Sequence, residues 1–501
     1  MLDKGPINQS SAGSNLGSFQ QGKVPVEFEW WSVIPFALML ISIAALPLIP
    51  KTQRLWEYHR VQLALALVLG VPVAAWLWFG GEHHTVLGSL WEYAQFIILL
   101  GSLYVISGGI FLAGDLKATP GTNTAFLAVG GMIASFIGTT GAAMLLIRPI
   151  LSTNAQRTHR RHTIVFAIFI IANCGGLLTP LGDPPLFLGM LRGVPFAWTF
   201  NLLPMWIFVN ALLLIVYFGI ERRFYDAETR QTVVTDAQEV QPIRVLGGGN
   251  FLWLGVVVAA VAFLPSLDGP AVLDGTASLT QMIPWREVAM LLAATISLTL
   301  GSRKVRYACN EFTWGPIAEV AALFIGIFLT MMPALKVLSA VAPRLPLSEL
   351  TFFVFTGGLS AFLDNAPTYV TFFEMARTLP GEPRVADVPE IYLVSIALGA
   401  VLCGAFTYIG NGPNFMVKAV AEDRGVPMPS FVGYLGWSGK YLTPVLTAMT
   451  LIFIVPTMWA TLGGIAVAIA IVITSMLSAR HHTRSPGASK PSKKTRDHVR
   501  A

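Results

Sequence analysis

Two polar segments interrupt long apolar runs of this chain, and both contain residues that could bind an ion. The first, Asn173 to Phe187, has three prolines, three glycines and Asp183 inside the apolar run 164–191. Proline cannot continue a regular helix, and a helix can break at membrane depth only where its backbone is buried in protein or lines a wet cavity. A carboxylate is costly in hydrocarbon, so Asp183 is a candidate functional residue.

The second segment, Cys403 to Phe415, lies inside the apolar run 390–418. Its last seven residues align with residues 181–187 at a shift of 228 positions, which places Asn411 opposite Asp183. Asn414 follows in the same break. Paired broken helices at matching positions of two halves are typical of the binding site of a secondary transporter.

The composition is that of an integral membrane protein. Of the 501 residues, 54% are hydrophobic and only 12% are charged, whereas soluble domains carry about 25% charged residues. The net charge of +6 is concentrated in loops and in the C-terminal tail, where it reports orientation rather than nucleic-acid binding. The chain has neither a metalloprotease nor a serine-hydrolase motif, nor a soluble region large enough for an ATPase, so we expect that it is not an enzyme.

Eleven apolar runs are candidates for membrane-spanning helices, and two further runs are interrupted. Arginine-rich loops, which should be cytoplasmic, fit this order only if 122–150 enters and returns on the cytoplasmic side and 351–376 does so from outside. We therefore predict an all-α polytopic protein with about 11 transmembrane helices and two re-entrant hairpins in an inverted-topology repeat. The spanning runs are 31–50, 61–80, 93–113, 164–191, 203–220, 251–265, 286–300, 316–338, 390–418, 432–456 and 458–478.

The same pattern divides the chain into five regions and orients it. The N-terminus should lie outside and the C-terminus in the cytoplasm, in the inner (cytoplasmic) membrane of the cell. The regions are a disordered tail at 1–30, a first helix and first repeat at 31–220 (hairpin 122–150, broken helix 164–191), a charged cytoplasmic linker at 221–250, the second repeat with flanking helices at 251–478 (hairpin 351–376, broken helix 390–418), and a basic tail at 479–501.

From about residue 60 to 478 the chain resembles the ion transporter superfamily, in which sodium/proton antiporters, citrate and dicarboxylate carriers and arsenite permeases occur. The segments Gly138–Pro149 and Leu363–Thr368 are similar to the antiporter and arsenite-permease branch. Neither hairpin tip has the Ser-Asn-Thr of dicarboxylate carriers. The resemblance implies a homodimer in the lipid bilayer, with a fixed scaffold and a moving transport unit.

The hairpin tips and helix breaks supply the candidate binding residues. Sodium prefers several oxygen ligands, and we expect Asp183 and Asp364 to provide charged ones. Each candidate also has a structural interpretation, since Asp183 and Asp364 could cap the helices that follow them, while the amides and hydroxyls could satisfy free backbone or pack between helices. The candidates are Thr139, Thr140, Asp183, Asp364, Asn365, Thr368, Asn411 and Asn414.

The chemistry of this set favours a small cation. Two carboxylates without lysine or arginine in the motif cores would repel citrate and suit the exchange of sodium for protons, since one carboxylate can hold either ion. We therefore predict an ion-coupled secondary transporter, a sodium/proton antiporter that works by alternating access and needs no cofactor beyond these ions. The alternative is a citrate or dicarboxylate transporter on the same fold, and an arsenite permease is a weaker third possibility.

Overall fold

The computed structural model describes residues 28–480, apart from residues 48, 57, 239, 268–271, 273 and 274. Most of this part is helical, and its strands form two small antiparallel sheets of two strands each. The all-α class is therefore confirmed. The N-terminal tail predicted at 1–30 and the basic tail at 479–501 lie almost entirely outside the described residues.

Six helical segments of the described part are long and apolar enough to cross a bilayer, which confirms a polytopic membrane protein. Three shorter apolar segments, 30–45, 250–263 and 390–406, accompany them. The predicted total of about 11 spans includes the shorter and broken helices and stays a prediction. The six long segments are His59–Phe79, His83–Ser107, Arg161–Leu178, Phe196–Asp226, Gly315–Arg344 and Met458–Ala479.

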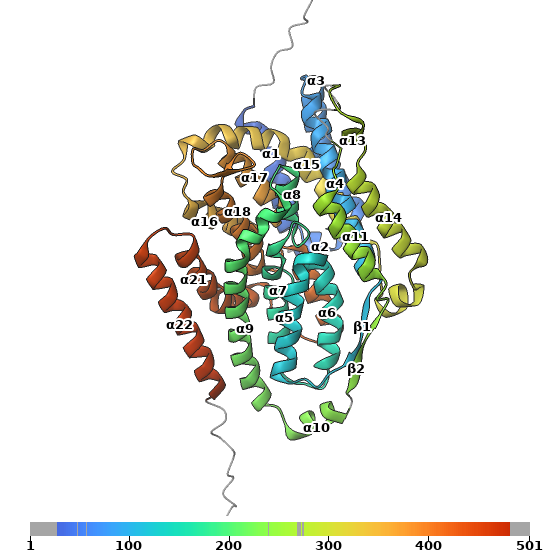
Figure 1. Ribbon diagram of the computed structural model, residues 1–501, viewed down its shortest axis with the longest axis vertical. Helices are drawn as coiled ribbons and strands as arrows, with labels where there is room; N and C mark the ends of the chain where they lie inside the picture. The colour runs from blue at the N-terminus through green and yellow to red at the C-terminus, as the bar shows by residue number, and fades with distance from the viewer. Residues whose placement is uncertain are drawn as a thin grey trace, which may run out of the picture.

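Two helical hairpins lie toward opposite ends of the molecule (Figure 1). Helices α5 (Pro120–Ile137) and α6 (Thr139–Thr153) form the first, toward the end that carries α10 (Arg230–Gln238). Helices α16 (Glu349–Ser360) and α17 (Asn365–Arg377) form the second, at the other end. The tip of the first hairpin turns at Gly138, whose φ of 81° favours glycine.

Both predicted broken helices are interrupted where the prolines and glycines occur. The first consists of α7 (Arg161–Ile170), the 3-10 turn η2 (Cys174–Leu178) and α8 (Pro184–Leu191). The second consists of α18 (Glu390–Cys403), η6 (Gly404–Phe406) and α19 (Gly412–Asp423). Each half-helix therefore ends near the middle of the described molecule, where its terminal backbone groups can face a site.

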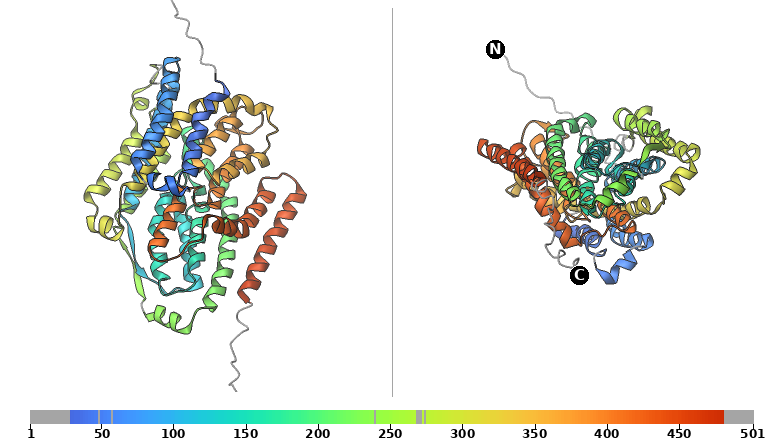
Figure 2. Two further views of the ribbon diagram at one scale, coloured as in Figure 1. Left: turned by 180° about the vertical axis from the view of Figure 1, so that it is seen from behind. Right: turned by 90° about the horizontal axis from the view of Figure 1, so that it is seen from below.

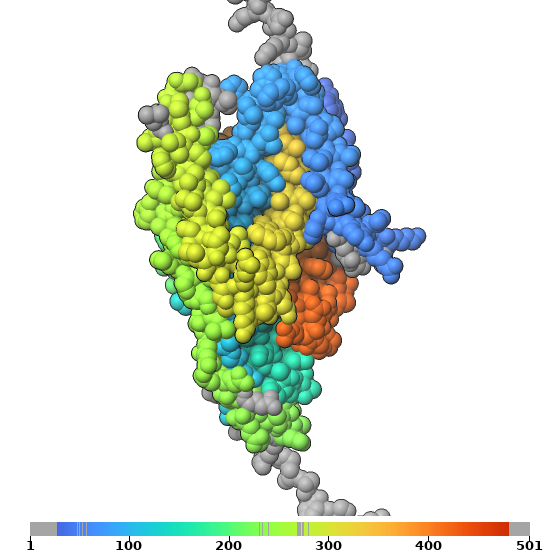
Figure 3. Space-filling model, turned by 90° about the vertical axis from the view of Figure 1, so that its right-hand side faces the viewer, coloured from blue at the N-terminus to red at the C-terminus, as the bar shows by residue number. Residues whose placement is uncertain are grey.

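A second group of helices packs beside the hairpins and forms a wall of the site. Helix α15 (Gly315–Val341) packs against α3 (His59–Phe79), α4 (His83–Ser107) and α1 (Ile34–Ala45). Phe96 of α4 stacks on Phe324 of α15 with ring centroids 4.7 Å apart. Figure 3 shows this face, with α3 in blue beside α15 in yellow and α19 in orange below them. We call α3, α4 and α15 the scaffold helices.

One detail of the sequence prediction is wrong. The apolar run 93–113 is not one helix, because α4 ends at Ser107 and residues 111–115 form strand β1. The linker predicted at 221–250 contains strand β2 (Gln241–Leu246), which pairs antiparallel with β1. The pairing satisfies backbone groups that a helix would otherwise bond internally. Its partners lie from 126 (Asp115 and Gln241) to 135 (Phe111 and Leu246) positions apart, which local apolar periodicity cannot indicate.

The remaining helices complete the bundle. Helix α22 (Met458–Arg480) packs against α9 (Leu203–Asp226) and α21 (Thr443–Phe453) at one side of the molecule, as seen from behind in Figure 2. The predicted run 432–456 is divided into α20 (Phe431–Trp437), the π-helix η7 (Ser438–Leu442) and α21. The other helices are η1 (Trp30–Val33), α2 (Pro50–Trp56), η3 (Phe196–Leu202), α11 (Asn250–Phe263), α13 (Leu279–Met282), α14 (Trp285–Leu300), η4 (Lys304–Cys309) and η5 (Ala342–Arg344). The remaining strands are β3 (Arg384–Val385) and β4 (Val388–Pro389).

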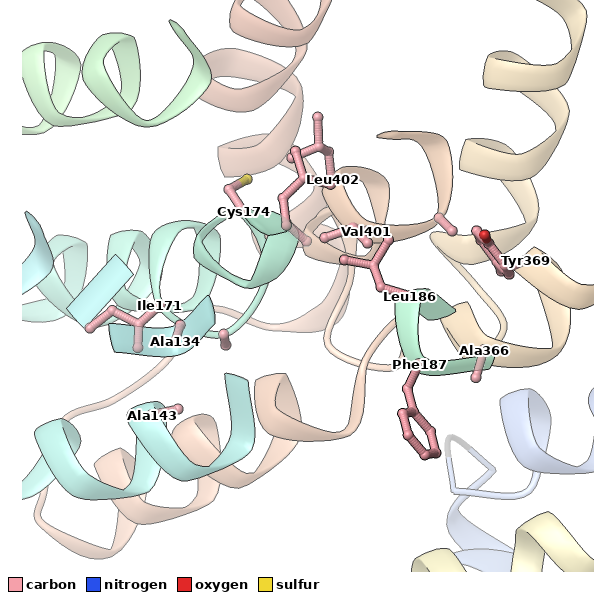
Figure 4. Packing of buried hydrophobic residues seen from close by; sticks show 14 of the residues in the cluster. Ala134, Ala143, Ile171, Cys174, Leu186, Phe187, Ala366, Tyr369, Val401 and Leu402 are labelled. Carbon is pink, nitrogen blue, oxygen red and sulfur yellow. The ribbon is translucent and has the colours of Figure 1, made fainter. Parts of the chain in front are cut away.

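The two broken helices pack together through buried apolar side chains. Figure 4 shows Cys174 of η2, Leu186 of α8, and Val401 and Leu402 of α18 around one part of this core. All four are less than 3% exposed. Dense packing of this kind fixes the polar ends of the half-helices relative to one another.

Candidate functional site

Asp183 lies at the centre of the polar residues that the breaks and hairpin tips bring together. It precedes α8, has an extended backbone (φ −145°, ψ 142°) and is 1% exposed. Its side chain makes no capping bond to α8, so the capping interpretation does not describe it. Instead, the carboxylate accepts hydrogen bonds from Thr139 Oγ1 at 3.0 Å, from Asn411 Nδ2 at 3.2 Å and from Asn365 Nδ2.

These three donors come from three different elements. Thr139 is the first residue of α6, Asn365 is the first residue of α17, and Asn411 precedes α19. Both hairpin tips and both helix breaks therefore meet at one carboxylate. Because Asn411 occupies the position that corresponds to Asp183, the second break adds an amide to the site where the first break adds a charge.

Similar hydrogen bonds support the two breaks. Ser135 of α5 donates from Oγ to the carbonyl of Gly175, and Thr179 donates back to the carbonyl of Ser135. In the other half, Ser360 donates to the carbonyl of Ala400 at 2.6 Å, and Thr407 donates to the carbonyl of Ala361 at 2.5 Å. Each hairpin is thereby joined to its own broken helix by one serine and one threonine bond. The threonine bonds occupy matching positions of the two halves, whereas the serine bonds are displaced along the chain.

Asn414 does not bond to the carboxylate of Asp183, but it binds backbone carbonyls of the second break. Its Nδ2 donates to the carbonyls of Gly404 and Thr407, each at 2.9 Å, and its Oδ1 accepts from Asn173 Nδ2 at 2.7 Å. Asn173 in turn accepts from Asn411 Nδ2 at 3.2 Å. The sequence interpretation did not name Asn173 as a site residue, although it begins the first interrupted segment and is 0% exposed.

Asn365 carries an oxygen without a partner. The residue is 0% exposed, its Nδ2 donates to Asp183, and its Oδ1 accepts no hydrogen bond from any described residue. A buried carbonyl oxygen without a donor is costly unless a water or an ion satisfies it. This oxygen and the carboxylate of Asp183 are therefore adjacent, electron-rich groups at the tip of the second hairpin.

The other predicted residues lie close by but have different partners. Asp364 accepts a hydrogen bond from the backbone amide of Ala366 at 3.0 Å and so caps α17, which is the structural role considered for it above. Its half-buried side chain also lines a cavity. Thr368 donates to the carbonyl of Asp364 at 3.0 Å, within its own hairpin arm. Thr140 is half-buried and lines the same cavity.

A cavity of about 90 Å³ lies between the scaffold helices and this polar centre. Phe96, Tyr104 and Phe324 line the scaffold side, and Gly182 and Pro184 beside Asp183 line the other. None of the described residues that line it is Lys, Arg or His. No group of three His, Cys, Asp or Glu side chains that could hold a metal ion occurs in the described part. An ion here would depend on one or two carboxylates and on neutral oxygens.

Two charged residues near the bundle have other roles. Glu319 of α15 accepts from Gln62 Nε2 of α3 at 3.0 Å and so joins two scaffold helices. Lys440 is exposed, with its ammonium 5.0 Å from the ring centroid of Tyr441. Neither lines the cavity beside Asp183.

The comparison with protein families gives a match over most of the chain. A sequence model of the family described as "Putative citrate transport" matches residues 25–454, nearly the whole chain and all of the elements that form the site. A comparison with curated proteins finds no match.

Proposed function

Because the chain belongs to the family described as "Putative citrate transport", we propose that it is an ion-coupled secondary transporter whose central site exchanges sodium for protons. The family supports transport across a membrane, and the six long apolar segments of the described part agree with this. The proposal of a cation depends on the site. Its main support is a buried carboxylate, Asp183, beside the unpartnered oxygen of Asn365.

The surroundings of Asp183 favour an ion of positive charge. The carboxylate is buried, and among the described residues no cationic side chain bonds to it or lines the adjacent cavity. A buried charge without a counter-ion is unfavourable, so the carboxylate should bind either a proton or a small cation. Sodium could take the Asp183 carboxylate and Asn365 Oδ1 as ligands. Competition of the two ions for one group is what exchange requires.

The arrangement around the carboxylate is suited to alternating access. Its hydrogen-bond donors are at the ends of half-helices and hairpins, while the scaffold helices supply only the apolar side of the cavity. The polar centre could therefore move as a unit past the scaffold without breaking its own hydrogen bonds. We propose the homodimer and the orientation, with the N-terminus outside and the C-terminus in the cytoplasm of the inner membrane, on the same basis as in the sequence analysis.

The test is sodium-driven proton movement. In everted vesicles with a preformed pH gradient, addition of sodium should dissipate the gradient when the wild-type protein is present. Asp183→Asn should abolish the response, because an amide cannot release a proton to a competing cation. A fluorescent pH probe follows the gradient over pH 6 to 9.

The matched control is Asp423→Asn, which removes an exposed carboxylate at the end of α19 and should leave the response unchanged. A wild-type protein that gives no sodium response at any pH in this range would contradict sodium/proton exchange. Equal loss in both variants would show that the effect of Asp183→Asn is not specific to the site.

Citrate transport is the second candidate, because the matching family is described by that substrate. Citrate is an anion, and the cavity offers it no described cationic side chain, so cations would have to bind at Asp183 first or together with it. Labelled citrate uptake into proteoliposomes, driven by a sodium or proton gradient, separates the two. The citrate transporter would be favoured if citrate uptake is saturable and if no sodium/proton exchange occurs when citrate is absent.

A further inference from the structure

A second cavity, of about 470 Å³, lies apart from the Asp183 site, at the start of α7. Its walls come from the loop between α6 and α7, the first turn of α7, Phe224 of α9 and the loop 425–427 that follows α19. Its most distinctive lining residues are basic or aromatic, and none of the described lining residues is Asp or Glu. They are Arg157, His159, Arg160, Arg161, His162 and Trp437.

Two of the arginines carry charges that no described carboxylate balances. Within the described part of the chain, the hydrogen bonds of Arg160 go only to backbone carbonyls, those of Ala155 at 3.3 Å and Gly425 at 3.4 Å. Arg161 likewise donates to the carbonyl of Pro427. These bonds position both guanidinium groups at the cavity and leave them additional donors, since a guanidinium has five N–H groups.

Arg157 is buried behind them and is only partly satisfied. It is 4% exposed, its Nη1 pairs with the buried carboxylate of Glu221, and its Nε lies 3.8 Å from Glu228 Oε1. Its Nη2 has no hydrogen-bond partner among the described residues, and the guanidinium lies 5.4 Å from the ring centroid of Tyr225. A buried N–H donor of a charged group that lacks an acceptor marks a place where an anion would lower the free energy.

Two acidic residues near this cavity, Glu221 and Glu228, already form ion pairs with residues of its wall. Glu221 also pairs with His162, and Glu228 lies 3.4 Å from His159 Nδ1. Burial raises the pKa of Glu228, but hydrogen bonds from the backbone amides of His159 and Thr158, together with the charge of Arg157, outweigh burial and hold its pKa below the usual value. Both carboxylates therefore balance part of the positive charge of the cavity wall, but neither of them lines the cavity.

The helix that begins here adds to the positive potential. Helix α7 is ten residues long, has no side chain that caps its N-terminus, and has no acidic residue in its first turn. The free amides and the positive end of the helix dipole at such an N-terminus attract anions. This effect coincides with the two arginines that no described carboxylate balances, and with the donor of Arg157 that has no described acceptor.

We propose that this cavity binds a phosphate group, as either the headgroup of an anionic phospholipid or a soluble phosphate. Tetrahedral phosphate oxygens can accept from several arginines at once, which a single carboxylate cannot do to the same extent. Trp437, which lines the cavity, would suit a headgroup at the membrane surface. Occupancy would connect the start of α7 with the loop after α19, and so brace the two broken helices against each other.

The test uses the full-length protein and two probes. Inorganic phosphate is titrated by calorimetry into protein held in phosphatidylcholine nanodiscs, and bound lipid is counted by native mass spectrometry after incubation with phosphatidylglycerol or phosphatidylcholine. We expect saturable binding of one probe or of both. Binding of phosphatidylglycerol alone identifies a lipid site, and binding of inorganic phosphate identifies a soluble ligand.

Arg160→Gln should weaken the binding at least about fivefold, because it removes one charge-assisted contact. Arg161→Gln is a second variant that tests the same cavity if Arg160→Gln misfolds. The matched control is Arg223→Gln, an exposed arginine of α9 outside the cavity, which should bind like the wild type. Absence of binding of both probes to the wild type, or equal weakening by Arg160→Gln and Arg223→Gln, would overturn the proposal.

Discussion

At the scale of single residues, the site is asymmetric. Asp183 and Asn411 occupy matching positions, but only Asp183 is charged, and Asn411 donates to it. A second carboxylate at 411 would place two like charges within hydrogen-bond distance in a buried position, which is strongly unfavourable. One charge surrounded by amides and a hydroxyl can bind one monovalent cation or one proton without a net buried charge.

The two asparagines Asn365 and Asn414 should respond differently to substitution. Asn365→Ala removes a candidate ligand and a donor to Asp183, so we expect the apparent sodium affinity to fall about tenfold, or about 1.4 kcal/mol. Asn414→Ala leaves two buried carbonyls without donors, at a cost on the order of 1–3 kcal/mol. Its main effect should be a lower melting temperature.

Sodium-dependence curves in proteoliposomes and thermal unfolding of the purified variants measure the two effects. A larger loss of melting temperature in Asn365→Ala than in Asn414→Ala would indicate that Asn365 is mainly a structural residue.

At the scale of elements, each break depends on a pair of glycines that lie almost in contact. A Cβ atom on Gly182 would lie 2.1 Å from the carbonyl oxygen of Gly176, and one on Gly410 would lie 2.6 Å from that of Gly404. Backbone segments cannot approach this closely with any larger residue. The glycines therefore allow the chain to cross between the two half-helices, which places Asp183 and Asn411 at the ends of the second halves.

Gly182→Ala should prevent correct folding of the first break, because the clash is with backbone rather than with a mobile side chain. Gly410→Ala should have the same effect on the second. Gly412→Ala is the control, since a Cβ there meets nothing within 4 Å. Size-exclusion chromatography of the extracted protein measures folded yield. A normal yield for Gly182→Ala would show that the breaks are less tightly packed than described.

At the scale of the whole molecule, one arginine joins the scaffold to the second hairpin. Arg192, just after α8, pairs with Glu92 of α4 at 2.7 Å and with Glu374 of α17 at 3.2 Å, and its side chain is 7% exposed. Toward the other end of the molecule, Arg148 of α6 pairs with Glu311 at 3.0 Å. Relative movement of hairpins and scaffold, which alternating access requires, would have to separate such pairs.

Arg192→Gln should therefore shift the population away from the present conformation. Spin labels at the exposed positions Leu90 on α4 and Thr378 after α17, in a Cys309→Ser background, report the separation of the two elements. We expect a longer or broader distance distribution than in the wild type. Arg344→Gln, at an exposed arginine, is the control and should leave the distribution unchanged.

Local sequence determined much of this protein. The apolar runs, the prolines and glycines, and the charged loops specify a helical membrane protein with two interrupted segments, because hydrophobic length and backbone chemistry act over a few residues. The candidates Asp183, Thr139, Asn365 and Asn411 could be named from the same patterns, because a polar residue inside an apolar run is conspicuous.

Only the tertiary structure decided how these residues meet. Their contacts join residues up to 241 positions apart, as between Asn173 and Asn414, and no local pattern specifies such a pairing. The tertiary structure also determines that Asp183 accepts hydrogen bonds from residues of three elements, whereas Asp364 caps the helix that follows it. Both have the same side chain at the start of a helix, and the difference arises from which neighbours the packing of the two halves places within hydrogen-bond distance.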